Sequence, residues 1–149
     1  MDELPEAAAA ARLGSVPLEA SLALNGDAFR IAHARRLAAT FLTKARDHRG
    51  IPVATATVEI VQLIVSELVT NARKHAPGPA RLNLRIVDAL LRIELWDSNP
   101  VPAAAKAPDP TRNGQHGMEI VAALAQTLIV EQTQQGKRIT ADVALTLVG

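Results

Sequence analysis

Apolar residues recur along the chain with two different periods, and these periods predict its helices and strands. Segments 28–47 and 53–75 place apolar residues three and four positions apart, which is the spacing of amphipathic helices. Segments 81–86 and 91–95 alternate apolar and polar residues strictly, as the half-buried strands of a hairpin do. The other elements that we expect are a short strand at 22–24, a helix over 118–125, and two closing strands at 128–131 and 139–147.

The order of these elements predicts the fold class. Helices fall between hairpin-type strands, and no strand-helix-strand unit is repeated. This order favours an α+β fold, a two-layer α/β sandwich with a mostly antiparallel sheet and helices on one face, over the doubly wound folds. Residues 1–20 keep no sustained period, so we expect a mobile N-terminal leader followed by one domain over 21–149.

Composition excludes several classes of function. The net charge is +1, with 16 Lys and Arg residues scattered among 15 Asp and Glu residues, and only three residues are aromatic. Neither a basic nucleic-acid footprint nor a stacking surface for bases is therefore expected. The absence of cysteine excludes disulfides, thiolate zinc sites and a cysteine nucleophile. The acidic start and the lack of a long apolar run predict a cytoplasmic protein with no signal peptide and no membrane contact.

Three polar residues, Glu67, Asn71 and His75, lie four positions apart at the end of the second predicted helix. This spacing places them on one helix face, which is apolar in the earlier turns. The amide oxygen of Asn71 is suited to Mg²⁺ when phosphate oxygens and water complete the octahedron, and Glu67 is placed to accept a proton. Lys74 and His75 can reach phosphate oxygens from the last turn. A helix end that is simply exposed to solvent would show the same spacing.

Two further features flank a long segment without periodicity that holds four of the nine prolines. Asp97 ends a strand directly before this segment, where its carboxylate could accept a hydrogen bond from an exocyclic amine; an Asp that caps a turn is the alternative. Gly114 and Gly117 follow the segment and open a helix, where bare backbone N–H groups form an anion site. Plain turn chemistry explains two glycines equally well.

Taken together and in this order, these features resemble the GHKL or Bergerat-fold ATPases, which contain a histidine-kinase-like ATPase domain. More narrowly, the chain is similar to the small stand-alone ATP-binding anti-sigma-factor serine kinases of bacteria, over residues 20–148. The N box of that family corresponds to residues 67–75. The resemblance implies that Asn71 holds Mg²⁺ and that Glu67 is the catalytic base. It also implies that Lys74 and His75 approach the phosphates of ATP.

The same resemblance assigns the adenine and phosphate contacts. Asp97 takes the place of the adenine-reading Asp of the G1 box, and residues 98–113 that of the ATP lid. Residues 117–121 resemble the G2 box that starts the phosphate-binding helix. Near the C-terminus, Arg138 aligns with a threonine that helps to bind adenine in the family, and Thr140 lies two residues on. The nucleotide-binding residues that we expect beyond Asn71, Lys74 and His75 are therefore Asp97, Asn99, Gly114, Gly117, Met118 and Thr140.

The resemblance implies a protein serine/threonine kinase that uses ATP and Mg²⁺ and acts as an anti-sigma factor. Its partners would be a sigma factor and an anti-anti-sigma protein of the STAS type, whose serine receives the γ-phosphoryl group. The sequence leaves the oligomeric state open, because the apolar first strand and helix could pair with a second copy to form a homodimer. The alternative is a non-catalytic regulatory module that sequesters a partner. This alternative is favoured by two departures from the family pattern: residues 98–101 are Ser-Asn-Pro-Val where glycines are expected, and Gln115 takes the place of a G2-box glycine. Glu67 and Asn71 oppose it.

Overall fold

A computed structural model describes residues 18–24, 31–75, 78–98 and 113–146. The described part of the chain contains, in order, β1 (Leu18–Leu24), α2 (Ile31–Arg49), α3 (Thr55–His75), β2 (Ala80–Val87), β3 (Leu90–Asp97), α4 (Asn113–Leu124), β4 (Thr127–Thr133) and β5 (Gly136–Ala144). None of the helices in these ranges is long and apolar enough to cross a membrane.

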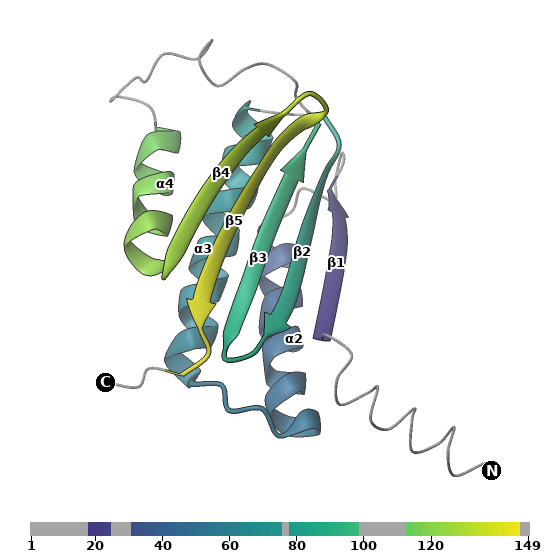
Figure 1. Cartoon of the computed structure of the whole chain (residues 1–149), viewed down its shortest axis with the longest axis vertical. Helices are drawn as coiled ribbons and strands as arrows, with labels where there is room; N and C mark the ends of the chain where they lie inside the picture. The colour runs from purple at the N-terminus through teal and green to yellow at the C-terminus, as the bar shows by residue number, and fades with distance from the viewer. Residues whose placement is uncertain (1–17, 25–30, 76–77, 99–112, 147–149) are drawn as a thin grey trace, which may run out of the picture.

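The five strands form one antiparallel sheet in the order β1-β2-β3-β5-β4. Helices α2 and α3 cover one face of this sheet, and α4 lies beside α3 at the β4 side (Figure 1). The α+β fold expected from the sequence, with a mostly antiparallel sheet and helices on one face, is therefore confirmed. We call the helix-covered face the inner face and the opposite one the outer face.

The core lies between α3 and the inner face of the sheet. Alternate residues of β2 and β3 point inward, as their strict alternation predicts, because successive side chains of a strand point to opposite faces. The fully buried residues here include Leu82, Leu84, Leu91, Ile93 and Leu95 from the sheet, and Val61, Ile64, Val65, Leu68 and Val69 from α3. The wide apolar surface of α3 is thus used for packing against the sheet.

Several boundaries differ from those expected. Strand β1 begins at Leu18, so it takes three residues that were assigned to the leader; residues 1–17 lie outside the described part. The β4–β5 hairpin is longer at its turn than the sequence predicts, and β5 ends at Ala144 instead of 147. Pairing with a neighbouring strand explains the longer β1 and the longer β4–β5 hairpin, because cross-strand contacts extend a strand beyond the residues whose own pattern is clear. Strand β5 ends where its pairing with β3 ends, at Ala144 opposite Leu90.

Hydrogen bonds fix the start of α3 to the end of β5. The Ala54 N–H donates to the Leu145 carbonyl (2.9 Å), and the fully buried Thr57 hydroxyl lies 3.0 Å from the same oxygen and 3.2 Å from the Ala144 oxygen. The Leu145 N–H in turn donates to the carbonyl of Ala89, in the β2–β3 turn (3.0 Å). These bonds set the position of α3 along the sheet.

The outer face carries paired charges. Arg92 on β3 donates from Nε and Nη2 to the two carboxylate oxygens of Asp142 on β5, at 2.9 and 3.2 Å, and the Thr127 hydroxyl donates to Asp142 Oδ2 at 3.1 Å. The hydrogen bonds and the charge of Asp142 raise the pKa of Arg92 above its ordinary value. This bidentate pair joins two strands that are far apart in the sequence.

We expect Asp142→Ala to lower the free energy of unfolding by about 1–2 kcal/mol, because Asp142 is nearly buried and accepts charge-assisted bonds while Arg92 remains partly solvated. Urea unfolding measures the change. Asp47→Ala is the control, since the Arg46–Asp47 pair is exposed and should contribute little. Equal changes in the two variants would contradict the importance of the Arg92–Asp142 pair.

Candidate functional site

Four parts of the chain meet at one end of the molecule. The C-terminal ends of α3 and β3, the N-terminal end of α4 and the β4–β5 turn all lie there (Figure 1). Most residues singled out by the sequence belong to these parts: Glu67, Asn71 and Lys74 to α3, Asp97 to β3, and Gly114, Gly117 and Met118 to α4. The fold therefore gathers the proposed N, G1 and G2 boxes at one end.

The polar pair on α3 lies partly inside the molecule. Asn71 is only 8% exposed and Glu67 is half-buried, while Lys74 is exposed; the side chain of His75 lies outside the described part. Neither the Asn71 nor the Glu67 side chain makes a hydrogen bond to another described residue. Neither side chain has a polar atom that is both fully buried and unpartnered, so both polar groups remain accessible at the edge of the core, which fits a ligand-binding pair better than a fully exposed helix end does.

Gly117 is in direct contact with Glu67. A Cβ atom built on Gly117 would lie 2.5 Å from Glu67 Oε1, which is too close for a non-bonded contact. The sequence suggested that this glycine opens a helix, but α4 begins at Asn113, so Gly117 lies past its first turn. Its lack of a side chain lets α4 approach the carboxylate on α3. The neighbouring Met118 is half-buried and packs against the core.

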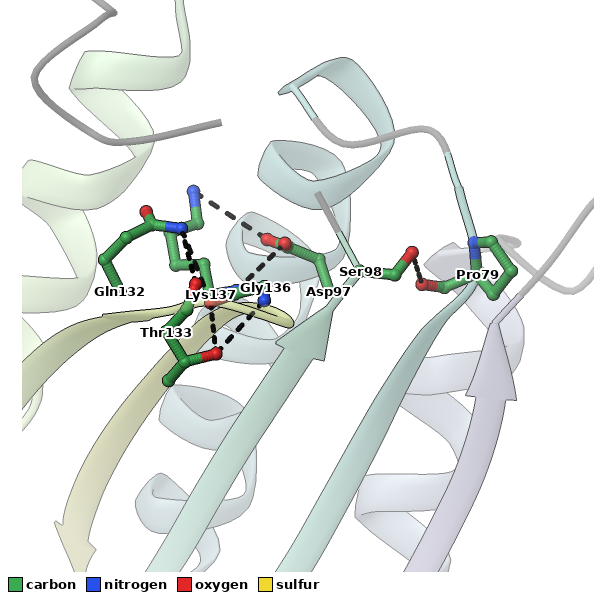
Figure 2. Close-up of polar contacts among 7 residues, drawn as sticks. All are labelled: Pro79, Asp97, Ser98, Gln132, Thr133, Gly136 and Lys137. Atoms are coloured by element: carbon green, nitrogen blue, oxygen red, sulfur yellow. Dashed lines mark hydrogen bonds and ion pairs between the residues drawn. The ribbon is translucent and has the colours of Figure 1, made fainter. Parts of the chain in front are cut away.

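Asp97 occupies the last inward-facing position of β3 and is 4% exposed. Its Oδ1 accepts a hydrogen bond from the Lys137 backbone N–H (3.2 Å), and its Oδ2 lies 3.9 Å from Lys137 Nζ (Figure 2). Gly136, with φ at +151°, approaches so closely that a Cβ atom there would overlap the Asp97 carbonyl oxygen. The Asp97 side chain therefore contacts β5, the neighbouring strand. A residue that only capped the turn after β3 would not need these contacts.

Sequence reasoning missed Lys137 and did not foresee where Thr140 would lie. Lys137 gives no signal of its own, because its proximity to Asp97 depends on β5 pairing with β3 across 40 positions of sequence. Thr140 pairs with Glu94 on the outer face, so the structure does not bring it to Asp97. Asn99 lies outside the described part of the chain, as do residues 99–112 of the expected lid.

A cavity of about 370 Å³ reaches Asp97 from the end of the sheet. Its lining includes Trp96, Ser98 and Gln135, and Ser98 is held in place by a hydrogen bond from its hydroxyl to the Pro79 carbonyl (3.0 Å, Figure 2). Glu67 and Asn71 do not line this cavity. Asp97 therefore lies on the inner face of the sheet and also lines a cavity at the end of the sheet.

The donor set fits ATP with Mg²⁺. No group of three or more His, Asp or Glu side chains in the described part of the chain is close enough to hold a metal by itself. Mg²⁺ usually takes only one or two protein ligands and completes its shell with phosphate oxygens and water, so one amide such as that of Asn71 suffices. The buried carboxylate of Asp97 is in turn a suitable acceptor for an exocyclic amine.

Comparisons with known proteins point to one family. The family model for the histidine kinase-like ATPase domain matches residues 28–143. No curated protein sequence matches the chain.

Two solved structures are similar to the chain. One is the histidine kinase domain from the Erythrobacter litoralis EL346 blue-light activated histidine kinase, with 20% identity and a TM-score of 0.48 over 75% of this chain and 61% of that one. The other is a structure of the Erythrobacter litoralis EL346 blue-light activated histidine kinase, with 23% identity and a TM-score of 0.49 over 62% of this chain and 32% of that one. The chain thus spans less than two thirds of either solved structure.

The contact between Gly117 and Glu67 predicts a coupled effect on stability. In a Glu67→Ala background, Gly117→Ala should raise the free energy of unfolding by about 1 kcal/mol, because alanine favours the helix over glycine by that amount. In the wild-type background the gain should be smaller, because the new Cβ displaces the Glu67 carboxylate. Urea unfolding of the four proteins gives the coupling energy.

The control is a second set of four proteins in which Glu59→Ala takes the place of Glu67→Ala. Glu59 is an exposed residue of the same helix. The effects of Glu59→Ala and Gly117→Ala should add. If Gly117→Ala has the same effect with and without the Glu67 side chain, the contact does not exist in solution.

Proposed function

Because the chain belongs to the histidine kinase-like ATPase domain family, we propose that it binds Mg·ATP and transfers the γ-phosphoryl group to a serine of a protein partner. The observation that carries this proposal is the pair of polar groups on α3: Asn71, which is 8% exposed but whose amide is not among the buried atoms without a partner, lies one turn from a Glu67 carboxylate that lies against α4.

The residues have separate roles in binding. Asn71 would hold Mg²⁺, and Lys74 and His75, in the last turn of α3, would contact the phosphates. Asp97 would accept a hydrogen bond from the exocyclic amine of adenine. Mg²⁺ supplies positive charge that neutralises the phosphate oxygens during transfer. Gly114, in the first turn of α4, lies where free backbone N–H groups favour an anion.

Glu67 is the proposed base. In the transfer step the serine oxygen forms a bond to the γ-phosphorus, the bond from that phosphorus to the bridging oxygen breaks, and ADP leaves. The serine proton passes to the Glu67 carboxylate. Glu67 is half-buried, and its carboxylate occupies the space that the missing side chain of Gly117 leaves beside α4, at the edge of the core and not on an open surface.

We further propose that the kinase acts as an anti-sigma factor. This step rests on the sequence resemblance to stand-alone anti-sigma-factor serine kinases. The substrate would be an anti-anti-sigma protein of the STAS type, and the sequestered protein a sigma factor. A second copy of the chain is an additional candidate partner. Phosphorylation of the substrate would then decide which partner the chain holds.

A non-catalytic module is the second candidate. Ser98 follows Asp97 where the family carries glycine, and its hydroxyl is hydrogen-bonded to Pro79. This hydrogen bond restricts the conformation of Ser98, the first residue of the segment 98–113 that the sequence predicts to be the ATP lid. In this case the chain would bind ATP, or no nucleotide, and regulate its partner by binding alone.

Substitutions at the α3 pair should separate chemistry from binding. We expect Glu67→Ala to lower phosphoryl transfer by about 10²–10⁴-fold with little change in ATP affinity, because it removes a general base. We expect Asn71→Ala to weaken Mg·ATP binding by about tenfold or more, because a charge-assisted contact is lost. Calorimetry with Mg·ATP and transfer of labelled phosphate to a candidate STAS-type protein measure the two effects.

Matched controls are available on α3 and on β2. Glu59→Ala changes an exposed carboxylate of α3, and Asn83→Ala changes an amide on the outer face that accepts a hydrogen bond from Ser21. Both should leave binding and transfer unchanged. Tight Mg·ATP binding without transfer by the wild-type chain would favour the non-catalytic module, and equal losses of binding and transfer in Glu67→Ala and Asn71→Ala would contradict the assigned roles.

A further inference from the structure

We propose that the free edge of β4 pairs with β4 of a second copy of this chain, so that the two sheets join across a two-fold axis. The sequence pattern suggested the first strand and helix as the surface for a homodimer, whereas β4 lies at the opposite edge of the sheet from β1. This inference assigns a surface to the second copy, and it does not depend on the proposed binding of ATP.

Strand β4 is an edge strand with two exposed apolar side chains. It pairs with β5 on one side, and no described strand pairs with its other side (Figure 1). Ile129 is 53% exposed and Val130 is 51% exposed, more than any other large apolar residue of the described part. Ile129 lies on the outer face and Val130 on the inner face, because neighbouring residues of a strand point to opposite faces. Helix α4 therefore leaves the middle of β4 uncovered.

This strand lacks the features that usually prevent an edge from pairing with another chain. Edge strands are commonly protected by lysine, by proline or by a bulge. The sequence of β4, Thr-Leu-Ile-Val-Glu-Gln-Thr, contains neither residue type, and its pairing with β5 runs one for one from Thr127 to Thr133 without a bulge. Its single charged residue is Glu131, whose carboxylate accepts a hydrogen bond from Arg138 Nε (2.7 Å). That charge is compensated within the chain and does not oppose pairing.

The residues of β4 complement a second copy of themselves in one antiparallel register. When Ile129 lies opposite its own copy, Leu128 lies opposite Val130 of the second copy, and Thr127 lies opposite Glu131. Apolar side chains then meet on both faces of the joined sheet, and no charge lies opposite a like charge. Centring the pair on Val130 instead would place Ile129 opposite Glu131. The apolar pattern therefore favours the register centred on Ile129, and a two-fold axis satisfies both copies at once.

The other edge strand, β1, offers less apolar surface to a second copy. Its inward-facing residues pack against the core, and Leu24 at its end is fully buried. The exposed residues of β1 are Glu19, Ser21 and Ala23, of which one is charged and none is a large apolar residue. An exposed carboxylate is one of the features that keep an edge solvated. The exposed apolar surface therefore distinguishes β4 from β1.

Sedimentation of the nucleotide-free chain over a range of protein concentrations tests the pairing. A strand of seven residues gives a small interface, so we expect a reversible equilibrium between monomer and dimer. Val130→Lys should raise the dissociation constant at least about tenfold, because it places an ammonium against Leu128 of the second copy. The control is Ala23→Lys, which adds the same charge at an exposed position of β1 and should keep the wild-type dissociation constant.

Cross-linking tests the register. The chain contains no cysteine, so a single introduced cysteine reports on one position. Ile129→Cys should give a disulfide-linked dimer on oxidation, because opposite residues of antiparallel strands have Cα atoms about 4.5–5.5 Å apart, within the range of about 4.4–6.8 Å that a disulfide spans. Ser21→Cys, at the middle of β1, is the control and should give none.

The outcomes decide between this surface and the alternatives. A chain that is monomeric at every concentration leaves the edge of β4 to a strand of a different protein and overturns the proposal. A dimer that is insensitive to Val130→Lys, or that cross-links through Ser21→Cys instead of Ile129→Cys, also overturns it. Species larger than a dimer contradict the two-fold pairing. The cross-linking result decides the case even if Val130→Lys fails to fold.

Calorimetry with Mg·ATP on the same samples separates this inference from the proposed function. A monomeric chain that binds Mg·ATP overturns the β4 pairing and leaves the proposed function in place. A dimer that cross-links through Ile129→Cys and binds no ATP supports the pairing and overturns the proposed function.

Discussion

The position of α3 on the sheet is the constraint on which the rest of the structure depends. Its apolar surface packs on the inner face, and the hydrogen bonds of Ala54 and Thr57 to Leu145 fix its first turn. Because a helix is rigid along its axis, this anchor at one end also determines where its last turns lie. Asn71 therefore reaches the site end of the sheet through packing that is unrelated to ligand binding.

Polar groups are concentrated where the apolar packing ends. Along the sheet, the buried rows finish at Asp97 and Lys137, and along α3 they finish at Asn71. Burying a carboxylate without partners would cost free energy, and Asp97 is held by the backbone N–H and the ammonium of Lys137 on the neighbouring strand. The site is thus built at the margin of the core, with a rigid apolar support beneath it.

The sequence predicted what depends on local pattern and missed what depends on strand order. Periodicity identified the β2–β3 hairpin and α3, and with them the elements that carry Glu67, Asn71 and Asp97. The neighbour of Asp97 could not be found in this way, because β3 and β5 are separated by α4 and β4. The alignment pointed to Arg138, with Thr140 two residues on, but both lie on the outer face, and only the pairing register shows that Lys137 is opposite Asp97.

Gly136 fixes the pairing register of β3 and β5 at the site end of the sheet by steric exclusion. Its backbone lies so close to the Asp97 carbonyl that no side chain fits between them, and the Thr133 hydroxyl is hydrogen-bonded to both its N–H and its carbonyl. A slip of one residue in the β3–β5 pairing would turn Lys137 away from α3 and expose Ile139. Such a slip would also move a bulkier residue into the place of Gly136. Steric repulsion at Gly136 therefore disfavours any other register of β3 and β5, and so keeps the apolar side chains of β5 on the inner face of the sheet.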